Sequence, residues 1–226
     1  MLAVVRRHLD ALSWFHRTIL LAAVLFVAWS STDSFGTLPQ RVVRDSFFLL
    51  VVPLAVGIAH GRRLGWRVNR RAVRNALLLS AFVTPFYVVG STLPTIREFY
   101  PMWGLDSLAL SAFLPHAVLQ LVVVLAVETY YRGLLCVGIR DRGPWVILIS
   151  PLLYAYYHLG SPPIEVLLSG PTDALFGVAD YDAGSILPSV VAHGFGLVLL
   201  DFLVLRDPVI DPETTVAWLE WLPVPL

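Results

Sequence analysis

Four polar side chains lie inside or beside strongly apolar stretches of this sequence, at spacings that could support hydrolysis. Glu128 and Arg132 are four residues apart in the stretch "VETYYRG", so one helix face would carry both and let them pair. His158 ends the stretch "YAYYH", and His193 begins the stretch "HGFGLVLLD". One Glu and two His from three helices have the composition of a catalytic zinc site with an open position for water. Alternatively, the same side chains could hold and deprotonate a water directly, as general bases do.

The segments that must position these residues are too apolar for an ordinary soluble domain. Of the 226 residues, 57% are hydrophobic and 14% are charged, and the mean hydropathy is +0.74. This composition indicates an integral membrane protein with lipids as partners. Basic and acidic residues balance at 16 each, so no net positive charge argues for nucleic acid, and we expect none as a partner. Cys136 is the single cysteine, which excludes an internal disulfide framework.

Apolar segments recur along the whole chain. A membrane span needs about 20 mostly apolar residues. Six segments approach or reach that length, at residues 15–29, 46–60, 75–93, 108–131, 144–158 and 185–205. A seventh, residues 164–178, is shorter and is broken by Gly170 and Pro171, so it is a distorted span or a re-entrant segment. The sequence therefore predicts an all-α polytopic transmembrane helix bundle of six to seven spans, built as one integral membrane domain over residues 1–226.

The placement of arginine predicts how the bundle is oriented. One short loop holds six of these residues, namely Arg62, Arg63, Arg67, Arg70, Arg71 and Arg74. Short loops rich in Arg stay on the cytoplasmic side of a membrane. The N-terminus, with Arg6, Arg7 and Arg17, lies two crossings away and hence on the same side. We predict an integral protein of the cell membrane with a cytoplasmic N-terminus.

Each candidate residue also has a structural interpretation. Glu128 could form an ion pair near the membrane surface, and His158 could cap the end of its helix before "GSPP". His193 lies within a predicted span, where a buried imidazole needs a polar partner. We interpret His116, which follows Pro115, as a packing or kink histidine. An ionisable residue at membrane depth costs about 2.5 to 3.5 kcal/mol on insertion scales, so a functional role is the default expectation.

Three motifs in this order resemble those of the CAAX protease and bacteriocin-processing (CPBP) family of intramembrane metalloproteases. The family motifs are Glu-Glu-x-x-x-Arg, Phe-x-x-x-His and His-x-x-x-Asn on successive helices. Here "VETYYR" keeps Glu128 and Arg132, "YAYYH" keeps His158 with Tyr154 in the aromatic place, and "HGFGL" keeps His193. The similarity covers about residues 119–205.

The resemblance implies a role for each matching residue. Glu128 and His158 would activate water, His193 would bind metal or stabilise the oxyanion, and Arg132 would hold Glu128 through a charge-assisted pair. A divalent metal, most simply zinc, would then bind to Glu128, His158 and His193. The polypeptide substrate would be membrane-associated or prenylated.

Two positions depart from the family pattern. Val127 occupies the place of the first Glu, which in the family is thought to activate water, and Leu197 occupies the place of the Asn. A valine cannot take a proton, and a leucine cannot donate a hydrogen bond. Glu165 and Asp201 are the available replacements. We predict that Glu165 supplies the carboxylate that Val127 lacks, although a negative charge in a first helical turn also has a structural benefit of about 0.3 to 1 kcal/mol.

These observations favour an intramembrane metalloprotease-like protein that cleaves a peptide bond with a Glu- and His-activated water. One alternative is a catalytically inactive scaffold or regulator that is derived from the family and keeps the polar cavity. A further alternative is a small proton-coupled transporter, in which the same buried Glu and His side chains relay protons.

Overall fold

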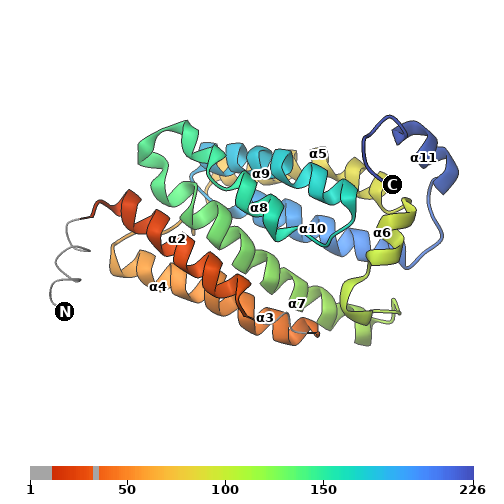
Figure 1. The fold of residues 1–226 in the computed structure, drawn as a ribbon, viewed down its shortest axis with the longest axis horizontal. Helices are drawn as coiled ribbons and strands as arrows, with labels where there is room; N and C mark the ends of the chain where they lie inside the picture. The colour runs from red at the N-terminus through yellow and green to blue at the C-terminus, as the bar shows by residue number, and fades with distance from the viewer. Residues whose placement is uncertain (1–11, 33–35) are drawn as a thin grey trace.

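Helices form all the regular structure of the residues that can be described, and they run side by side in an elongated bundle (Figure 1). The structure is a computed structural model that describes residues 12–32 and 36–226. It confirms the predicted all-α bundle. The predicted position of the N-terminus, including Arg6 and Arg7, falls outside the described residues.

The end of α7 separates the helices into an N-terminal group and a C-terminal group. The first half contains α2 (Trp14–Ser30), α3 (Leu38–Asp45), the π-helix η1 (Ser46–Val51), α4 (Val52–Ala59), α5 (Arg70–Gly90), α6 (Pro94–Phe99), the 3₁₀-helix η2 (Met102–Gly104) and α7 (Leu110–Glu128). The second half contains the π-helix η3 (Thr129–Leu134), the 3₁₀-helices η4 (Val137–Arg142) and η5 (Pro144–Leu148), α8 (Pro151–Tyr157), α9 (Pro163–Ala183), α10 (Leu187–Val204) and α11 (Pro212–Leu219).

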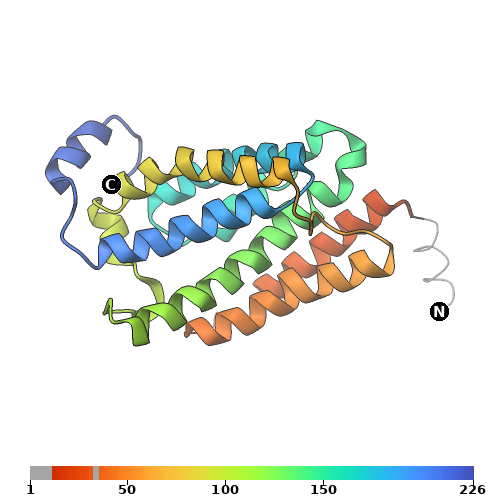
Figure 2. The ribbon, with the colours of Figure 1, turned by 180° about the vertical axis from the view of Figure 1, so that it is seen from behind.

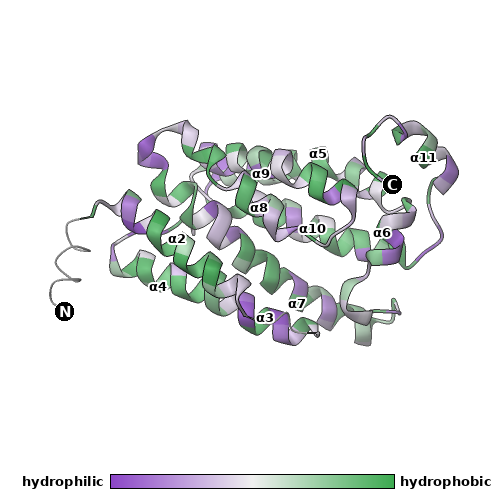
Figure 3. Ribbon diagram, in the orientation of Figure 1, coloured by the Kyte–Doolittle hydropathy of each residue, from purple (hydrophilic) through white to green (hydrophobic). Residues whose placement is uncertain are grey.

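Among the described residues, four helical stretches are long and apolar enough to cross a membrane. They are Leu38–Ala59, Arg70–Gly90, Leu110–Arg142 and Leu187–Val204. Two shorter apolar stretches, Trp14–Ser30 and Pro144–Tyr157, correspond to the other two segments expected from the sequence. In Figure 3, hydrophobic residues fill the middle of the bundle helices, and hydrophilic residues gather toward the two ends of the bundle. This distribution suits a protein whose middle lies in lipid.

Proline and asparagine mark where several helices begin. The second predicted span starts at Leu38 rather than near residue 46, because Thr37 is extended and Pro39 fits the first turn of α3. Asn69 caps α5, where its side-chain oxygen accepts a hydrogen bond from the backbone N–H of Ala72 at 2.9 Å.

The structure of α9 differs from the interrupted segment that the sequence predicted at residues 164–178. Gly170 and Pro171 do not break it, and α9 continues as one 21-residue helix to Ala183. The helix packs against α5, α8 and α10, and it carries the buried side chains of Asp173 and Asp180. Because contacts with three neighbours stabilise it, a single interior proline is tolerated.

The helix α7 runs through the middle of the bundle, with α3 on one side and α10 on the other (Figures 1 and 2). On the side that faces away from α7, α10 lies beside α5 along much of its length (Figure 2). Gly196 permits this close approach, since a Cβ atom there would lie 2.0 Å from Cε2 of Tyr87 on α5. The central position of α7 brings its polar residues into contact with α10, and the π-helix that follows it reaches α9.

Candidate active site

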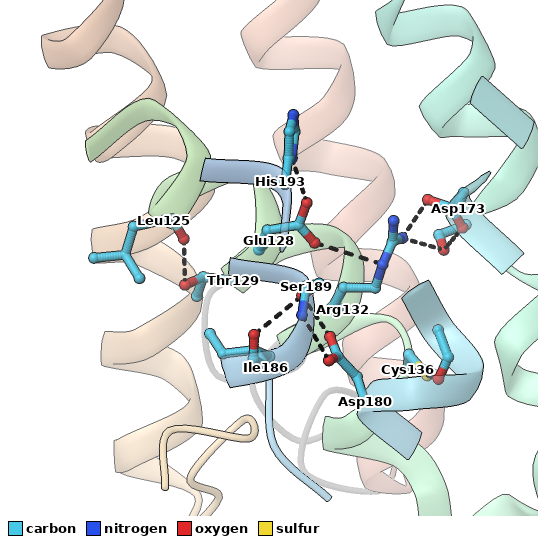
Figure 4. Close-up of polar contacts among 12 residues, drawn as sticks. Leu125, Glu128, Thr129, Arg132, Cys136, Asp173, Asp180, Ile186, Ser189 and His193 are labelled. Carbon is cyan, nitrogen blue, oxygen red and sulfur yellow. Dashed lines mark hydrogen bonds and ion pairs between the residues drawn. The ribbon is translucent and has the colours of Figure 1, made fainter. Parts of the chain in front are cut away.

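Glu128 and His193 meet in the contact between α7 and α10 (Figure 4). The Nδ1 atom of His193 lies 2.7 Å from Oε1 of Glu128. Glu128 is fully buried, whereas the His193 side chain is 13% exposed. Because an ionised carboxylate only accepts hydrogen bonds, Nδ1 of His193 carries the proton and Nε2 of the neutral ring is left as an acceptor.

Arg132 is the second buried partner of Glu128, as the sequence predicted. Its Nε atom lies 3.5 Å from Oε2 of Glu128, and both side chains are inaccessible to solvent. Arg132 also forms an ion pair with Asp173 on α9. The hydroxyl of Ser150 donates to Oδ2 of Asp173 at 2.6 Å. One guanidinium therefore faces two buried carboxylates from two helices (Figure 4).

A change of helix type occurs at these residues. The α-helix ends at Glu128, and the π-helix η3 carries the chain from Thr129 to Leu134. Short π-helical insertions are rare and occur often at functional sites. The N–H of Leu135 closes the last of these wider turns on the carbonyl of Tyr130 at 3.2 Å. Arg132 thus lies in the wider turns of a π-helix, and its side chain reaches Asp173 on α9.

A cavity of about 240 Å³ lies beside the pair of Glu128 and His193. Its polar wall contains Arg41, Tyr100, Gln120, Tyr157, His158, Ser161 and His193, together with the indole of Trp103. The remaining wall is mostly apolar and includes Phe99, Met102, Val123, Val124, Val127, Leu159 and Leu197. Both candidate histidines therefore lie in the wall of one cavity, while Glu128 is buried behind His193.

His158 is oriented by the backbone of its own helix. Its Nδ1 atom lies 2.9 Å from the carbonyl oxygen of Tyr154, and His158 is the residue that ends α8. A carbonyl oxygen can only accept, so Nδ1 again carries the proton and Nε2 stays free of one in the neutral ring. Helix capping, which the sequence left open as an explanation, is thus compatible with a position in the cavity wall.

The two departures from the family motifs lie in the same cavity. Val127, which precedes Glu128, and Leu197, which lies four residues after His193, both contribute to its wall. Val127 is only 1% exposed, so it presents a small part of its side chain to this space. Where the family pattern has a carboxylate and an amide, this cavity presents two aliphatic side chains.

Glu165 does not belong to the cavity wall. It lies in the first turn of α9, and its Oε2 atom accepts a hydrogen bond from the hydroxyl of Tyr100 at 3.2 Å. Tyr100 lies between α6 and η2 and does line the cavity. Burial and the nearby Glu165 carboxylate raise the pKa of the Tyr100 phenol well above its usual value, so the phenol remains a donor. A catalytic role for Glu165 stays a prediction.

Asp201 pairs with a residue that the sequence did not suggest. Its Oδ2 atom lies 2.9 Å from Nε2 of His116, and both side chains are buried between α10 and α7. His116 is therefore an ion-pair or hydrogen-bond partner rather than a packing residue alone. Asp201 and His193 are both on α10, yet they contact different ends of α7.

The predicted zinc ligands do not form a preorganised metal site. Within residues 12–32 and 36–226, no group of three or more His, Cys, Asp or Glu side chains is placed to hold a metal ion. Glu128 uses one oxygen for His193, and its other oxygen faces Arg132. Both carboxylate oxygens of Glu128 are therefore engaged with cationic or N–H groups and are not directed toward the cavity. Zinc at Glu128, His158 and His193 stays a prediction, and metal analysis of the purified protein would test it.

The apolar helix bundle with buried ionisable groups defines a polytopic membrane protein that has a polar cavity within its helices. Comparison with known families gives a match over residues 109–197 to the family described as Type II CAAX prenyl endopeptidase Rce1-like. The matched segment contains Glu128, Arg132, His158 and His193. This match supports membership of the CAAX protease-like proteins of the CPBP family. No curated protein and no solved structure matches it.

Proposed function

We propose that this protein is an intramembrane endopeptidase of the cell membrane that hydrolyses a peptide bond in a membrane-associated or prenylated polypeptide. The observation that carries the proposal is the 2.7 Å contact between Nδ1 of His193 and Oε1 of Glu128, at the edge of a cavity that also contains His158. A buried carboxylate that orients an imidazole is the arrangement by which hydrolases create a general base.

The proposed chemistry starts from a water molecule in the cavity. Nε2 of His193 accepts a proton from the water as its oxygen bonds to the carbonyl carbon of the scissile peptide. The resulting imidazolium is stabilised by Glu128, whose charge Arg132 holds in place. The proton then passes to the peptide nitrogen as the C–N bond breaks. Nε2 of the neutral His158 ring can accept a second hydrogen bond from the same water, because Nδ1 carries the ring proton.

A cleavage assay with purified protein in lipid nanodiscs tests this proposal. The substrate is a farnesylated peptide with a free carboxy terminus, and the products are separated by mass. We expect His193→Ala to reduce the rate by about 10²- to 10⁴-fold, the usual contribution of a general base. His60→Ala is the matched control, because His60 is an exposed histidine beyond the end of α4. Equal rates for the His193 and His60 variants would refute the proposal.

One observation favours a second candidate, a family-derived binding protein without turnover. Val127 and Leu197 put aliphatic groups at two cavity positions where the family has a base and a hydrogen-bond donor. Such a protein would bind the farnesylated peptide and release it intact. Saturable binding in the same nanodiscs, together with the absence of any product, would establish this second function instead.

A further inference from the structure

The cavity reaches the surface at one end of the bundle, the end that holds α6 and α11 (Figure 1). Two connecting segments form this part of the wall, one between α6 and η2 and the other after α8, and together they contribute Phe99, Tyr100, Met102, Trp103, Leu159, Gly160 and Ser161. Leu159 is 63% exposed, and Gly160 is exposed beside it. Among the described residues, none of residues 60–74 or 137–146, at the opposite end, belongs to the wall. We call the end beside Leu159 the mouth end and the opposite end the closed end.

Tight packing separates the cavity from the closed end. The side chains of Glu128, Arg132 and Asp173 are fully buried, and they join α7 and η3 to α9. Gly133 follows directly, and a Cβ atom there would lie 2.8 Å from the carbonyl oxygen of Leu64 in the loop after α4. Leu64 is itself only 2% exposed. In the described part of the chain, the mouth beside Leu159 is therefore the route by which a polypeptide can enter.

Exposed arginines gather at the closed end. The indole of Trp14 donates to the carbonyl oxygen of Gly138 at 2.8 Å, which holds the beginning of α2 beside η4. Nε of Arg67 donates to the carbonyl oxygen of Gly184 at 2.7 Å, which holds the loop before α5 beside the end of α9. Seven exposed arginines lie in residues 60–74 and 137–142, namely Arg63, Arg67, Arg70, Arg71, Arg74, Arg140 and Arg142.

The mouth end has the opposite charge. Nη2 of Arg97 donates to the carbonyl oxygen of Arg206 at 2.6 Å, which joins α6 to the segment after α10. Arg206 is the one exposed arginine in residues 36–45, 91–109, 158–163 and 205–226. Six acidic residues are exposed in the same ranges, namely Glu98, Asp106, Asp207, Asp211, Glu213 and Glu220. The two ends of the bundle therefore differ strongly in their number of exposed arginines.

We propose that polypeptides enter the cavity from the non-cytoplasmic side of the membrane, through the mouth beside Leu159. Short loops rich in arginine stay in the cytoplasm, which puts the closed end inside and the mouth end outside. This inference rests on the proposed function for the choice of a polypeptide and adds the class of substrate. The substrate is an exported polypeptide, or a segment of a membrane protein that faces outward.

Labelling of single cysteines tests which end faces outward. The native Cys136 is fully buried, so the wild type should give little signal. Leu159→Cys and Asp207→Cys introduce a thiol at the mouth end, and Val68→Cys is the matched control at the closed end, where Val68 is 74% exposed. A membrane-impermeant maleimide is added to spheroplasts that express the full chain. We expect both mouth variants to be labelled equally before and after permeabilisation, and Val68→Cys to be labelled only afterwards.

Two reporter polypeptides test the side from which substrate is taken. Each has one membrane span and the same apolar segment next to an epitope, which is placed outside the cytoplasm in one reporter and inside it in the other. We expect the protein to cleave the outward reporter and to leave the inward reporter at the level seen with His193→Ala. Maleimide added from outside should also stop cleavage of the outward reporter in Leu159→Cys and leave it unchanged in Val68→Cys.

Several outcomes would overturn the inference. Labelling of Val68→Cys in intact spheroplasts, alone or together with the mouth variants, would exclude a single orientation with the mouth outside. A Leu159→Cys thiol that stays unlabelled after permeabilisation would show that the cavity does not open there. Cleavage of the inward reporter alone would refute entry from outside and leave the endopeptidase standing. If neither reporter is cleaved although the labelling is as expected, the endopeptidase is refuted and the outward mouth stands.

Discussion

Arg132 and Asp173 form a fully buried ion pair that joins the π-helix after α7 to the middle of α9. The same guanidinium faces Glu128, and Ser150 donates to the other oxygen of Asp173. Removal of the guanidinium would leave two buried carboxylates without their cation. We therefore expect Arg132→Ala to lower the free energy of unfolding by about 3 to 5 kcal/mol, as found when one partner of a buried pair is removed.

Denaturant titration in detergent micelles would measure this loss. Arg132→Lys should recover only part of it, because a point charge cannot face both carboxylates as a planar fork does. The control is Arg71→Ala, which removes a pair with the exposed residue Asp182 and should cost no more than about 1 kcal/mol. Equal losses for the two alanine variants would show that the buried pair does not stabilise the fold.

The packing of α10 on α5 gives a prediction that is independent of charge. A Cβ atom at Gly196 would lie 2.0 Å from Cε2 of Tyr87, so Gly196→Ala must displace the Tyr87 ring or separate the helices. Overpacking of this kind costs about 1 to 3 kcal/mol. Gly90→Ala is the control, because nothing lies within 4 Å of a Cβ atom there. If the thermal midpoints of both variants equal that of the wild type, the helices are not in close contact at Gly196.

Part of the geometry of the candidate site was predictable from the sequence. The four-residue spacing of Glu128 and Arg132 predicted their contact, because helix geometry alone places such residues on one face. The order of the motifs likewise placed His158 and His193 around a common cavity. These inferences succeeded because they needed only local geometry or a known pattern.

Partners between helices could not be predicted in the same way. Asp173 lies in a segment that the sequence suggested was broken, so its contact with Arg132 was missed. His116 and Asp201 are 85 residues apart, and the pairing depends on the antiparallel register of α7 and α10. The available signal was the presence of one acid and one histidine in each of these helices, although composition does not fix which residues pair.

The pair of His116 and Asp201 gives a test of that register. Asp201→Ala should leave the buried imidazole without its partner and lower the free energy of unfolding by about 1 to 3 kcal/mol. His116→Ala should have a comparable effect, and the double variant should lose less than the sum of the two. A double-mutant cycle in denaturant measures this coupling. Strict additivity would mean that the two side chains do not interact.

Glu165 can be tested apart from its structural contact. Glu165→Gln removes the carboxylate, and Tyr100→Phe removes only the hydroxyl that donates to it. If Glu165 acts in catalysis, as the sequence predicts, Glu165→Gln should abolish cleavage, whereas Tyr100→Phe should retain it. Both should be nearly as stable as the wild type, because a charge at the first turn of α9 contributes about 0.3 to 1 kcal/mol. Full activity of Glu165→Gln would assign the residue to helix stabilisation alone.

Val127 offers the most direct test of whether the cavity can be made more active. A glutamate at this position would restore the first carboxylate of the family motif in the wall that also holds His158 and His193. We expect Val127→Glu to raise the cleavage rate, because a second general base in the cavity can contribute up to about 10²- to 10⁴-fold.

Val127→Gln is the matched control for this change, since it has the same shape and cannot take a proton. It should have no more activity than the wild type, and it should be the more stable of the two variants, because an ionised carboxylate costs more than an amide at a site that is 1% exposed. Rates are compared on the farnesylated peptide, after each variant has been shown to elute as a single species in detergent. A folded Val127→Glu protein that cleaves no faster than Val127→Gln would mean that the carboxylate does not reach the reacting carbonyl, and that the cavity holds its ligand in a position unsuited to hydrolysis from this side.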